Sequence, residues 1–220
     1  RFYRVARDCA SGRMTSVALC MCALSLVPNP AARSQRLQQL VVQQRTAGPD
    51  RARATEIDGL IAELAAGRSR FDRRAFDGGL WVTAYTSGRL PLWRVGDNIA
   101  GQAYDARDGT VVNYAEILGP WLTLRAEGTF TADDSTARCP KDFTATVTGG
   151  AVECAGLRLT LPIQGTGSLR VLYADRFARV FSTPSDNSAG WEKEGLVACQ
   201  VPAAAVGAAA AEARALGATA

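Results

Sequence analysis

The chemistry open to this chain is limited first by a residue type that it lacks. None of its 220 residues is a histidine. The commonest general base is therefore missing, together with the Ser-His and Cys-His nucleophile pairs and most zinc and haem-iron sites. Chemistry based on carboxylates or lysine stays open, but no motif in the chain supports it. We therefore expect a protein that is not an enzyme and has no metal site.

The six cysteines do not suggest a reactive centre either. No two of them have C-x-x-C spacing, which argues against a metal knuckle or a redox motif. Cys20 and Cys22 lie in an apolar run and are expected to act as small hydrophobic side chains. Cys139, Cys154 and Cys199 fall in the strand-rich half of the chain, where a disulfide between two of them and three free thiols are both open.

Trp81 and Tyr85 are the first candidates for contact with a bound molecule. An Asp-Gly-Gly turn at residues 77–79 opens a predicted strand, and period two places Trp81, Thr83 and Tyr85 on one face. The two aromatic rings could line an apolar cavity and contact a ring or a polyene. They could also fill the core, as inward aromatic residues of small barrels usually do.

Three polar residues complete the set of candidate ligand-binding side chains. Gln102 and Asn113 could direct their amides at a ligand head group or a quinone oxygen, or they could satisfy buried backbone groups. Arg179 follows Asp175 by four residues. That spacing favours an ion pair at a strand edge or a turn contact, with an anion clamp as the alternative.

Short strands must position these side chains. Apolar and polar residues alternate in nine or ten segments between residues 80 and 201, with no helical pattern among them, which indicates an up-and-down antiparallel barrel. We expect Asp142–Thr148 and Ala151–Cys154 to form a hairpin about Gly149-Gly150, so that Cys154 faces Ala145. Other expected strands include a short edge piece at Leu92–Arg94, Leu157–Leu161, and a last strand at Glu194–Val201.

Helices are expected before the strands in the chain, and an alanine-rich tail follows the strands. A short helix is predicted at Ser34–Arg45, and a clearer one begins at a capping box formed by Thr55 and Asp58 and ends at Gly67. The chain therefore divides into residues 1–33, a helical lead-in at 34–76, the strands at 77–201 and an alanine-rich tail at 202–220. The tail is expected to be a helix with few anchors or a mobile end.

The N-terminal segment has a basic flank, followed by the uncharged run Met14–Val27. Fourteen helical residues span about 21 Å, which is too short for a hydrocarbon core of about 30 Å. The pattern is typical of a secretory or thylakoid-transfer signal, and an interfacial anchor or a helix covered by a partner protein are the alternatives. The net charge of +4 comes from scattered arginines and favours weak attraction to anionic lipids rather than nucleic-acid binding.

Three blocks of sequence occur in an order and spacing that resemble a known family. A helix with spaced leucines precedes the pattern Gly-x-Trp-x-x-x-Tyr-Thr-Ser at residues 79–87. A glutamine, an acidic turn and Val-Asn follow at residues 102–113, and Tyr-x-Asp-x-x-x-Arg-Val at residues 173–180. Together these blocks, across roughly residues 55–201, resemble the plastid lipid-associated proteins, also called plastid fibrillins. The chain departs from the family pattern at residues 183–190, where a shorter connection is usual.

The resemblance implies a mainly β fold, with a lipocalin-like antiparallel β-barrel preceded by short helices. It implies a non-enzymatic protein of the chloroplast that binds apolar lipids, prenylquinones or carotenoids at the thylakoid membrane. No cofactor is tightly required, and a carotenoid, quinone, chlorophyll or lipid is the expected bound molecule. The alternative is a structural or assembly subunit with a plugged barrel, docked on a photosystem or antenna complex through residues 1–30.

Overall fold

The computed structural model describes residues 29–71, 73–87, 98–133, 135–183 and 196–217. The apolar run Met14–Val27, the expected edge piece Leu92–Arg94 and most of the 183–190 insertion lie outside the described residues. Among the helices that are described, none is both long and apolar enough to cross a bilayer.

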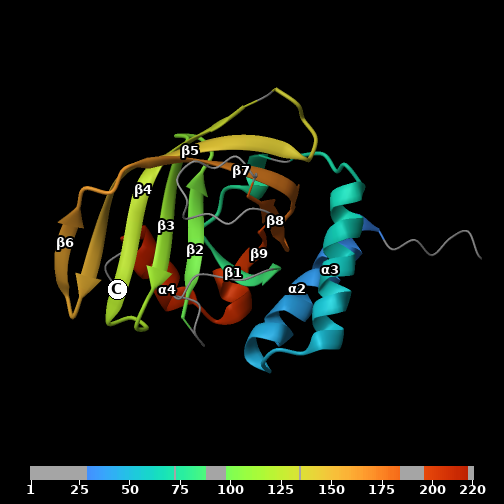
Figure 1. Ribbon diagram of the computed structural model, residues 1–220, viewed down its shortest axis with the longest axis horizontal. Helices are drawn as coiled ribbons and strands as arrows, with labels where there is room; N and C mark the ends of the chain where they lie inside the picture. Colours follow the sequence, from blue (N-terminus) through green and yellow to red (C-terminus); the bar gives the residue numbers. More distant parts are fainter. Residues whose placement is uncertain (1–28, 72, 88–97, 134, 184–195, 218–220) are drawn as a thin grey trace, which may run out of the picture.

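The strands form one antiparallel sheet that closes on itself (Figure 1). In the described chain the strand order is β4-β3-β2-β1-β9-β8-β7-β5-β6, and β4 also pairs with β5. Every strand except β6 therefore has a neighbour on each side, and the sheet is a ring. The strands are β1 (Leu80–Ser87), β2 (Ala100–Asp105), β3 (Thr110–Glu116), β4 (Leu122–Ala132), β5 (Lys141–Cys154), β6 (Leu157–Leu161), β7 (Gly165–Ala174), β8 (Arg179–Ser182) and β9 (Val197–Pro202).

Two helices precede the ring, as predicted, but the second begins earlier than the sequence suggested. They are α2 (Pro30–Thr46) and α3 (Arg51–Ala66). The side chain of Asp50 caps α3 by accepting from the Arg53 amide at 2.7 Å. Thr55, the predicted cap, lies inside the helix and its hydroxyl donates to the Arg51 carbonyl. Asp50 is the better cap because its carboxylate also complements the positive end of the helix dipole.

The helix pair covers part of the outer surface of the ring, at the right in Figure 1. Residues that pair directly across strands share a face, so the register separates an outer face from an inner one. Outer residues of β7, β8 and β9 pack with the apolar stripes of both helices. This cluster includes Leu37, Leu40, Val41, Ile57, Ile61, Leu64, Tyr173, Val180, Cys199 and Val201.

The described part of the alanine-rich tail is largely helical, and its helix has more anchors than the sequence suggested. It forms a short 3-10 turn η2 (Ala203–Val206) and the helix α4 (Ala209–Leu216), which lies behind the sheet in Figure 1. Small buried residues of α4, Ala211 and Ala215, let it pack closely on the outer face of β1 and β3. The side chain of Glu212 fixes it further by accepting from the Leu80 amide at 2.9 Å.

The predicted hairpin at Gly149-Gly150 is wrong, because β5 runs through both glycines as one strand. Neither glycine has the positive φ that a two-residue hairpin turn requires, whereas Ala155 and Gly156 have φ values of 49° and 83°. The hairpin therefore joins β5 to β6. As a result Cys154 lies opposite Leu122 on β4 and Leu157 on β6, not opposite Ala145.

Candidate functional site

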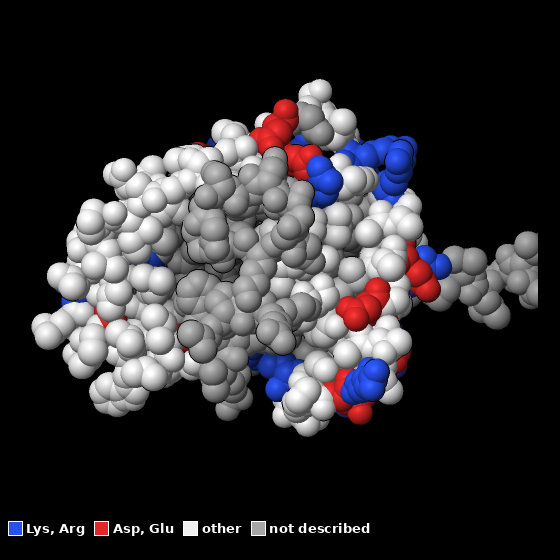
Figure 2. Space-filling view, in the orientation of Figure 1, with Lys and Arg blue, Asp and Glu red and all other residues white. Residues whose placement is uncertain are grey.

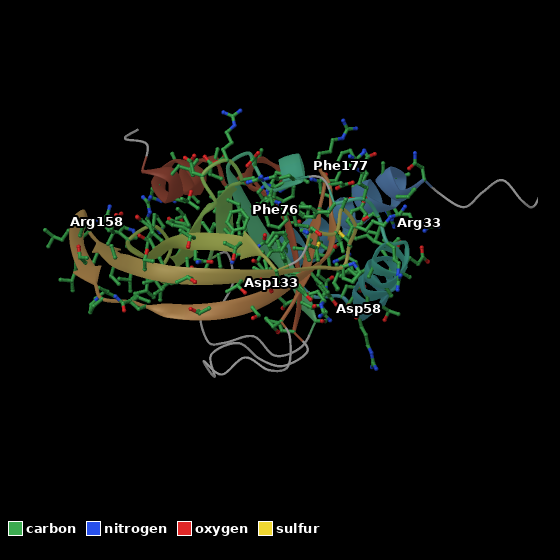
Figure 3. All side chains as sticks on the ribbon, turned by 90° about the horizontal axis from the view of Figure 1, so that it is seen from above. Arg33, Asp58, Phe76, Asp133, Arg158 and Phe177 are labelled. Carbon is green, nitrogen blue, oxygen red and sulfur yellow. The ribbon has the colours of Figure 1, made fainter. Side chains whose placement is uncertain are left out.

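The inside of the ring has three levels, and the lowest is a floor of aromatic side chains. Phe76 precedes β1 and lies inside the ring, as Figure 3 shows, with an exposure of 1%. Its ring stacks on Phe143 at a centroid distance of 5.3 Å and meets Tyr104 edge-on at 4.9 Å. Phe130 and Phe181 complete the cluster. Aromatic pairs in these geometries pack tightly, so this end of the ring is filled.

Arg179 lies at the upper edge of the floor and is fully buried. Its guanidinium carbon is 3.8 Å from the centroid of the Trp81 ring and 5.1 Å from the centroid of the Phe76 ring. Its Nε donates to the carbonyl of Ala75 at 2.6 Å and one Nη donates to that of Asp77 at 3.4 Å. Burial lowers the pKa of Arg179 to about 9, so the group still carries its charge at neutral pH.

The expected contact between Asp175 and Arg179 does not form within the described part of the chain. Asp175 instead organises the turn between β7 and β8 by accepting from the amides of Phe177 and Ala178. It also accepts from the hydroxyls of Ser34 and Tyr173, which ties the turn to α2. The two residues separate because Arg179 begins β8 on the inner face, where it pairs with Gln200 of β9.

A belt of amide side chains lies above the floor. Gln200 donates to Gln102 at 3.0 Å, and Gln102 donates to Asn113 at 2.7 Å. Tyr104 also donates to the side-chain oxygen of Gln102 at 3.1 Å. The structure thus brings Trp81, Gln102, Asn113 and Arg179 together inside the ring, as expected of one site. Gln200, which holds the belt together, was not singled out from the sequence.

Tyr85 does not join this site, contrary to the prediction that it shares a face with Trp81. The pairing between β1 and β9 shifts between Thr83 and Tyr85, which is a β-bulge with Ala84 as the extra residue. Tyr85 consequently faces outward, opposite Cys199, and packs under the helices. Its hydroxyl donates to Asp58 of α3 at 2.8 Å. Strict period-two counting fails here because the bulge reverses the faces beyond it.

Three buried polar atoms of the site have no hydrogen-bond partner among the described residues. They are the indole nitrogen of Trp81, the Nη1 of Arg179 and the side-chain oxygen of Gln200. The exposed fractions of these three residues are 4%, 0% and 3%. An unpaired buried polar atom costs about 1–3 kcal/mol, so these three atoms are candidates for contact with ordered water or with a bound molecule.

The upper level is an apolar wall made by the parts of β4, β5 and β6 that extend away from the floor. Leu122, Cys154 and Leu157 pair across these strands, and so do Leu124, Val152 and Leu159. Both rows lie on the same face as Ala126, which pairs with the inward Asn113. Leu157 and Leu159 are 78% and 64% exposed although they are leucines. The inner wall is therefore apolar and accessible.

The outer face of these strands is polar, as the opposite side of such a wall should be. Arg158 of β6 lies 3.5 Å from Glu153 and 3.7 Å from Glu127, and Arg125 pairs with Glu127 at 2.9 Å. Alternation along β6 thus separates leucines from charges.

A hollow of about 490 Å³ lies beside β5 and β7, and its lining includes Val147 and Gly165 but no residue of the amide belt.

The structure adds two findings on the remaining predicted chemistry. In the described chain no three His, Cys, Asp or Glu side chains gather where they could hold a metal ion. Cys139, Cys154 and Cys199 are free thiols. Cys139 and Cys199 are buried, and burial raises the pKa of both.

No family model matches the chain, and no curated protein matches it. The resemblance to the plastid fibrillins therefore stays a prediction made from the three sequence blocks.

Proposed function

We propose that the protein binds an elongated apolar molecule inside the ring, without catalysing a reaction on it. The observation that carries this proposal is the accessible leucine wall, which continues into a belt of polar side chains with unpaired atoms. An apolar chain lying on the wall would cover Leu157 and Leu159. Its polar end would then reach the belt, above the aromatic floor.

The energetics favour a ligand with a long apolar part and one polar end. Burial of apolar surface contributes about 25 cal/mol per Å², so covering two exposed leucines and a ligand chain contributes several kcal/mol. The belt orients the ligand, because a ligand that leaves the polar atoms of the belt unpaired binds with lower affinity. Apolar lipids, prenylquinones and carotenoids all have the required long apolar part.

The chloroplast setting and the thylakoid lipids as partners are part of the same proposal, and the sequence resemblance supports them. The first experiment is to purify the full chain, extract it with organic solvent and identify any molecule present at a stoichiometric amount. The second is titration with diphenylhexatriene, an apolar polyene that fluoresces strongly when it leaves water. We expect saturable binding of one polyene per chain.

Matched variants locate the binding. Leu159→Asn changes the inner wall, and Thr160→Asn changes the neighbouring position on the outer face of the same strand. We expect the first variant to weaken polyene binding and the second to leave it unchanged. A wild-type protein that yields no ligand and does not bind the polyene contradicts the proposal.

A second function is supported by a separate feature, the connection between β3 and β4. Leu118 and Trp121 are 67% and 72% exposed there. A structural subunit docked on a membrane complex would cover such residues, and the filled floor is consistent with a ring that holds no ligand. A protein without ligand that co-migrates with a thylakoid complex, and separates from it when residues 1–30 are deleted, would favour this function over the first.

A further inference from the structure

We propose that the polar end of the bound molecule is a hydroxyl group, held by Trp81, Arg179 and Gln200. This inference rests on the proposed binding function and names the chemical class of the ligand: a long apolar alcohol or phenol. It excludes ketones, quinones and hydrocarbons as preferred ligands. The argument uses the number and kind of the unpaired atoms in the belt.

The three unpaired atoms belong to one group of contacting side chains. Trp81 pairs with Gln102 across β1 and β2, and Arg179 pairs with Gln200 across β8 and β9. The guanidinium stacks on the indole at 3.8 Å, and the amide of Gln200 bonds to that of Gln102 at 3.0 Å. The four residues therefore form one connected group across β1, β2, β8 and β9.

The direction of the hydrogen bonds fixes which atoms are open. Gln200 uses its NH₂ group to donate to Gln102, and Gln102 uses its own NH₂ group to donate to Asn113. The atom left on Gln200 is consequently the oxygen, an acceptor. The atoms left on Trp81 and Arg179 are N–H donors. Because Nη1 carries two hydrogens, the site offers three N–H donors and one acceptor.

A hydroxyl group complements this set. Its oxygen accepts two hydrogen bonds and its hydrogen makes one, so it can bond to the indole N–H of Trp81, to one N–H of Arg179 and to the oxygen of Gln200. A carbonyl oxygen has no hydrogen for Gln200, and an ether has none either. A carboxylate has the same deficit. Burial lowers the pKa of Arg179 to about 9 and Asp77 offsets only part of that effect, so the buried charge also attracts an anion, and dodecanoate is included in the test for this reason.

The test compares ligands on the wild-type protein, so its outcome does not depend on whether a variant folds. Dodecan-1-ol, its methyl ether and dodecanoate would each compete with diphenylhexatriene for the full chain. We expect the alcohol to displace the polyene at a concentration about tenfold lower than the ether, because the ether leaves Gln200 unpaired. Equal displacement by alcohol and ether overturns the inference, as does tighter binding of dodecanoate.

Variants assign the preference to the residues. Gln200→Met removes the acceptor at similar size, and we expect it to abolish the difference between alcohol and ether. Tyr85→Phe removes a hydroxyl from the outer face of the same β1 strand and should keep the full difference. A difference that persists in Gln200→Met overturns the assignment. If the polyene binds but none of the three dodecyl compounds displaces it, the inference fails while the proposed function stands. If the polyene does not bind, both fail.

Discussion

At the scale of single residues, Arg179 has a structural role that its position in the sequence did not predict. Its two donated hydrogen bonds satisfy the carbonyls of Ala75 and Asp77, which lie in the segment that enters the ring. Its guanidinium also contacts the rings of Trp81 and Phe76. One side chain therefore joins the floor, the belt and the start of β1. Spacing to Asp175 suggested a surface pair, because sequence distance does not reveal which face a strand residue takes.

Arg179→Lys tests this role. An ammonium group keeps the charge but can neither stack as a plane nor donate in two fixed directions, so at least one buried carbonyl loses its partner. We expect the free energy of unfolding to fall by about 2–3 kcal/mol, measured by urea denaturation. Arg176→Lys is the matched control in the preceding turn, where Arg176 is exposed. Equal stability of the two variants would contradict the role.

Cys199 gives a prediction on pH. Burial, and to a smaller extent Asp175, raises the pKa of this thiol from 9.0 to about 12. Above pH 9 the unfolded chain loses the proton while the folded protein keeps it. The contribution of the thiol to stability is therefore complete below pH 9 and is lost as pH rises toward 12, by about 1.4 kcal/mol per pH unit.

The measurement is urea unfolding of wild type and Cys199→Ala between pH 8 and 10.5. The stability difference between the two proteins should shrink above pH 9 at about that slope. Cys154→Ala, at an exposed thiol, should show no such change. A difference that stays constant across the range would show that the buried thiol titrates normally.

At the scale of elements, local patterns predicted the strands well but not their connections. Alternation identified β6 to the residue, and the helix before the ring ended at Gly67 as expected. The Gly149-Gly150 pair resembles a hairpin turn in isolation, but β4 pairs with β5 from Phe143 to Cys154 and keeps both glycines extended. The bulge at Ala84 likewise depends on the partner strand β9. Both features depend on tertiary contacts between strands, and local sequence patterns do not predict such contacts.

The helix α4 provides a test at this scale. Arg214 bonds to Glu116 at 2.5 Å and to the Tyr114 hydroxyl at 3.1 Å. Although burial alone would lower the pKa of Arg214, these two bonds raise it. Glu116 is only 5% exposed, so its carboxylate depends on this partner. The pair holds the chain end against β3.

Arg214→Met should lower the free energy of unfolding by about 2–3 kcal/mol, because it leaves a buried carboxylate with Tyr114 as its remaining bonded partner. Adding Glu116→Gln removes the uncompensated charge and should recover part of the loss. A double-mutant cycle in urea then gives a coupling of about 1 kcal/mol or more. Additive effects of the two substitutions would mean that α4 is held by apolar packing alone.

At the scale of the whole molecule, the ring is asymmetric in both packing and charge. One end is filled by aromatic residues, and the helices cover one side of the outer surface. Figure 2 shows charged side chains over α2 and α3 and at the top over the start of β5, and few at the left of the view around β6. The inner rows of β4, β5 and β6 consist of Leu, Val and Cys side chains, so this part of the inner face is apolar. This division between a filled end and an open apolar wall would give the proposed long ligand one orientation.

The wall predicts how affinity depends on ligand length. Each methylene that leaves water contributes about 0.8 kcal/mol, or about fourfold in affinity, for as long as the wall covers it. Titration with primary alcohols of increasing length should therefore show a steep rise followed by a plateau where the chain passes Leu157. Leu159→Asn should flatten the rise for the longer alcohols only, since shorter chains do not reach that part of the wall.

The same variant should leave stability almost unchanged, within about 0.5 kcal/mol, because Leu159 is already 64% exposed in the folded protein. Thr160→Asn, on the outer face, should alter neither stability nor the length dependence. Affinity that rises with length equally in Leu159→Asn and wild type would show that the chain lies elsewhere, and the orientation with its polar end at Gln200 would then lose its support. A loss of binding for all lengths, with stability intact, would place the polar end rather than the chain at β6.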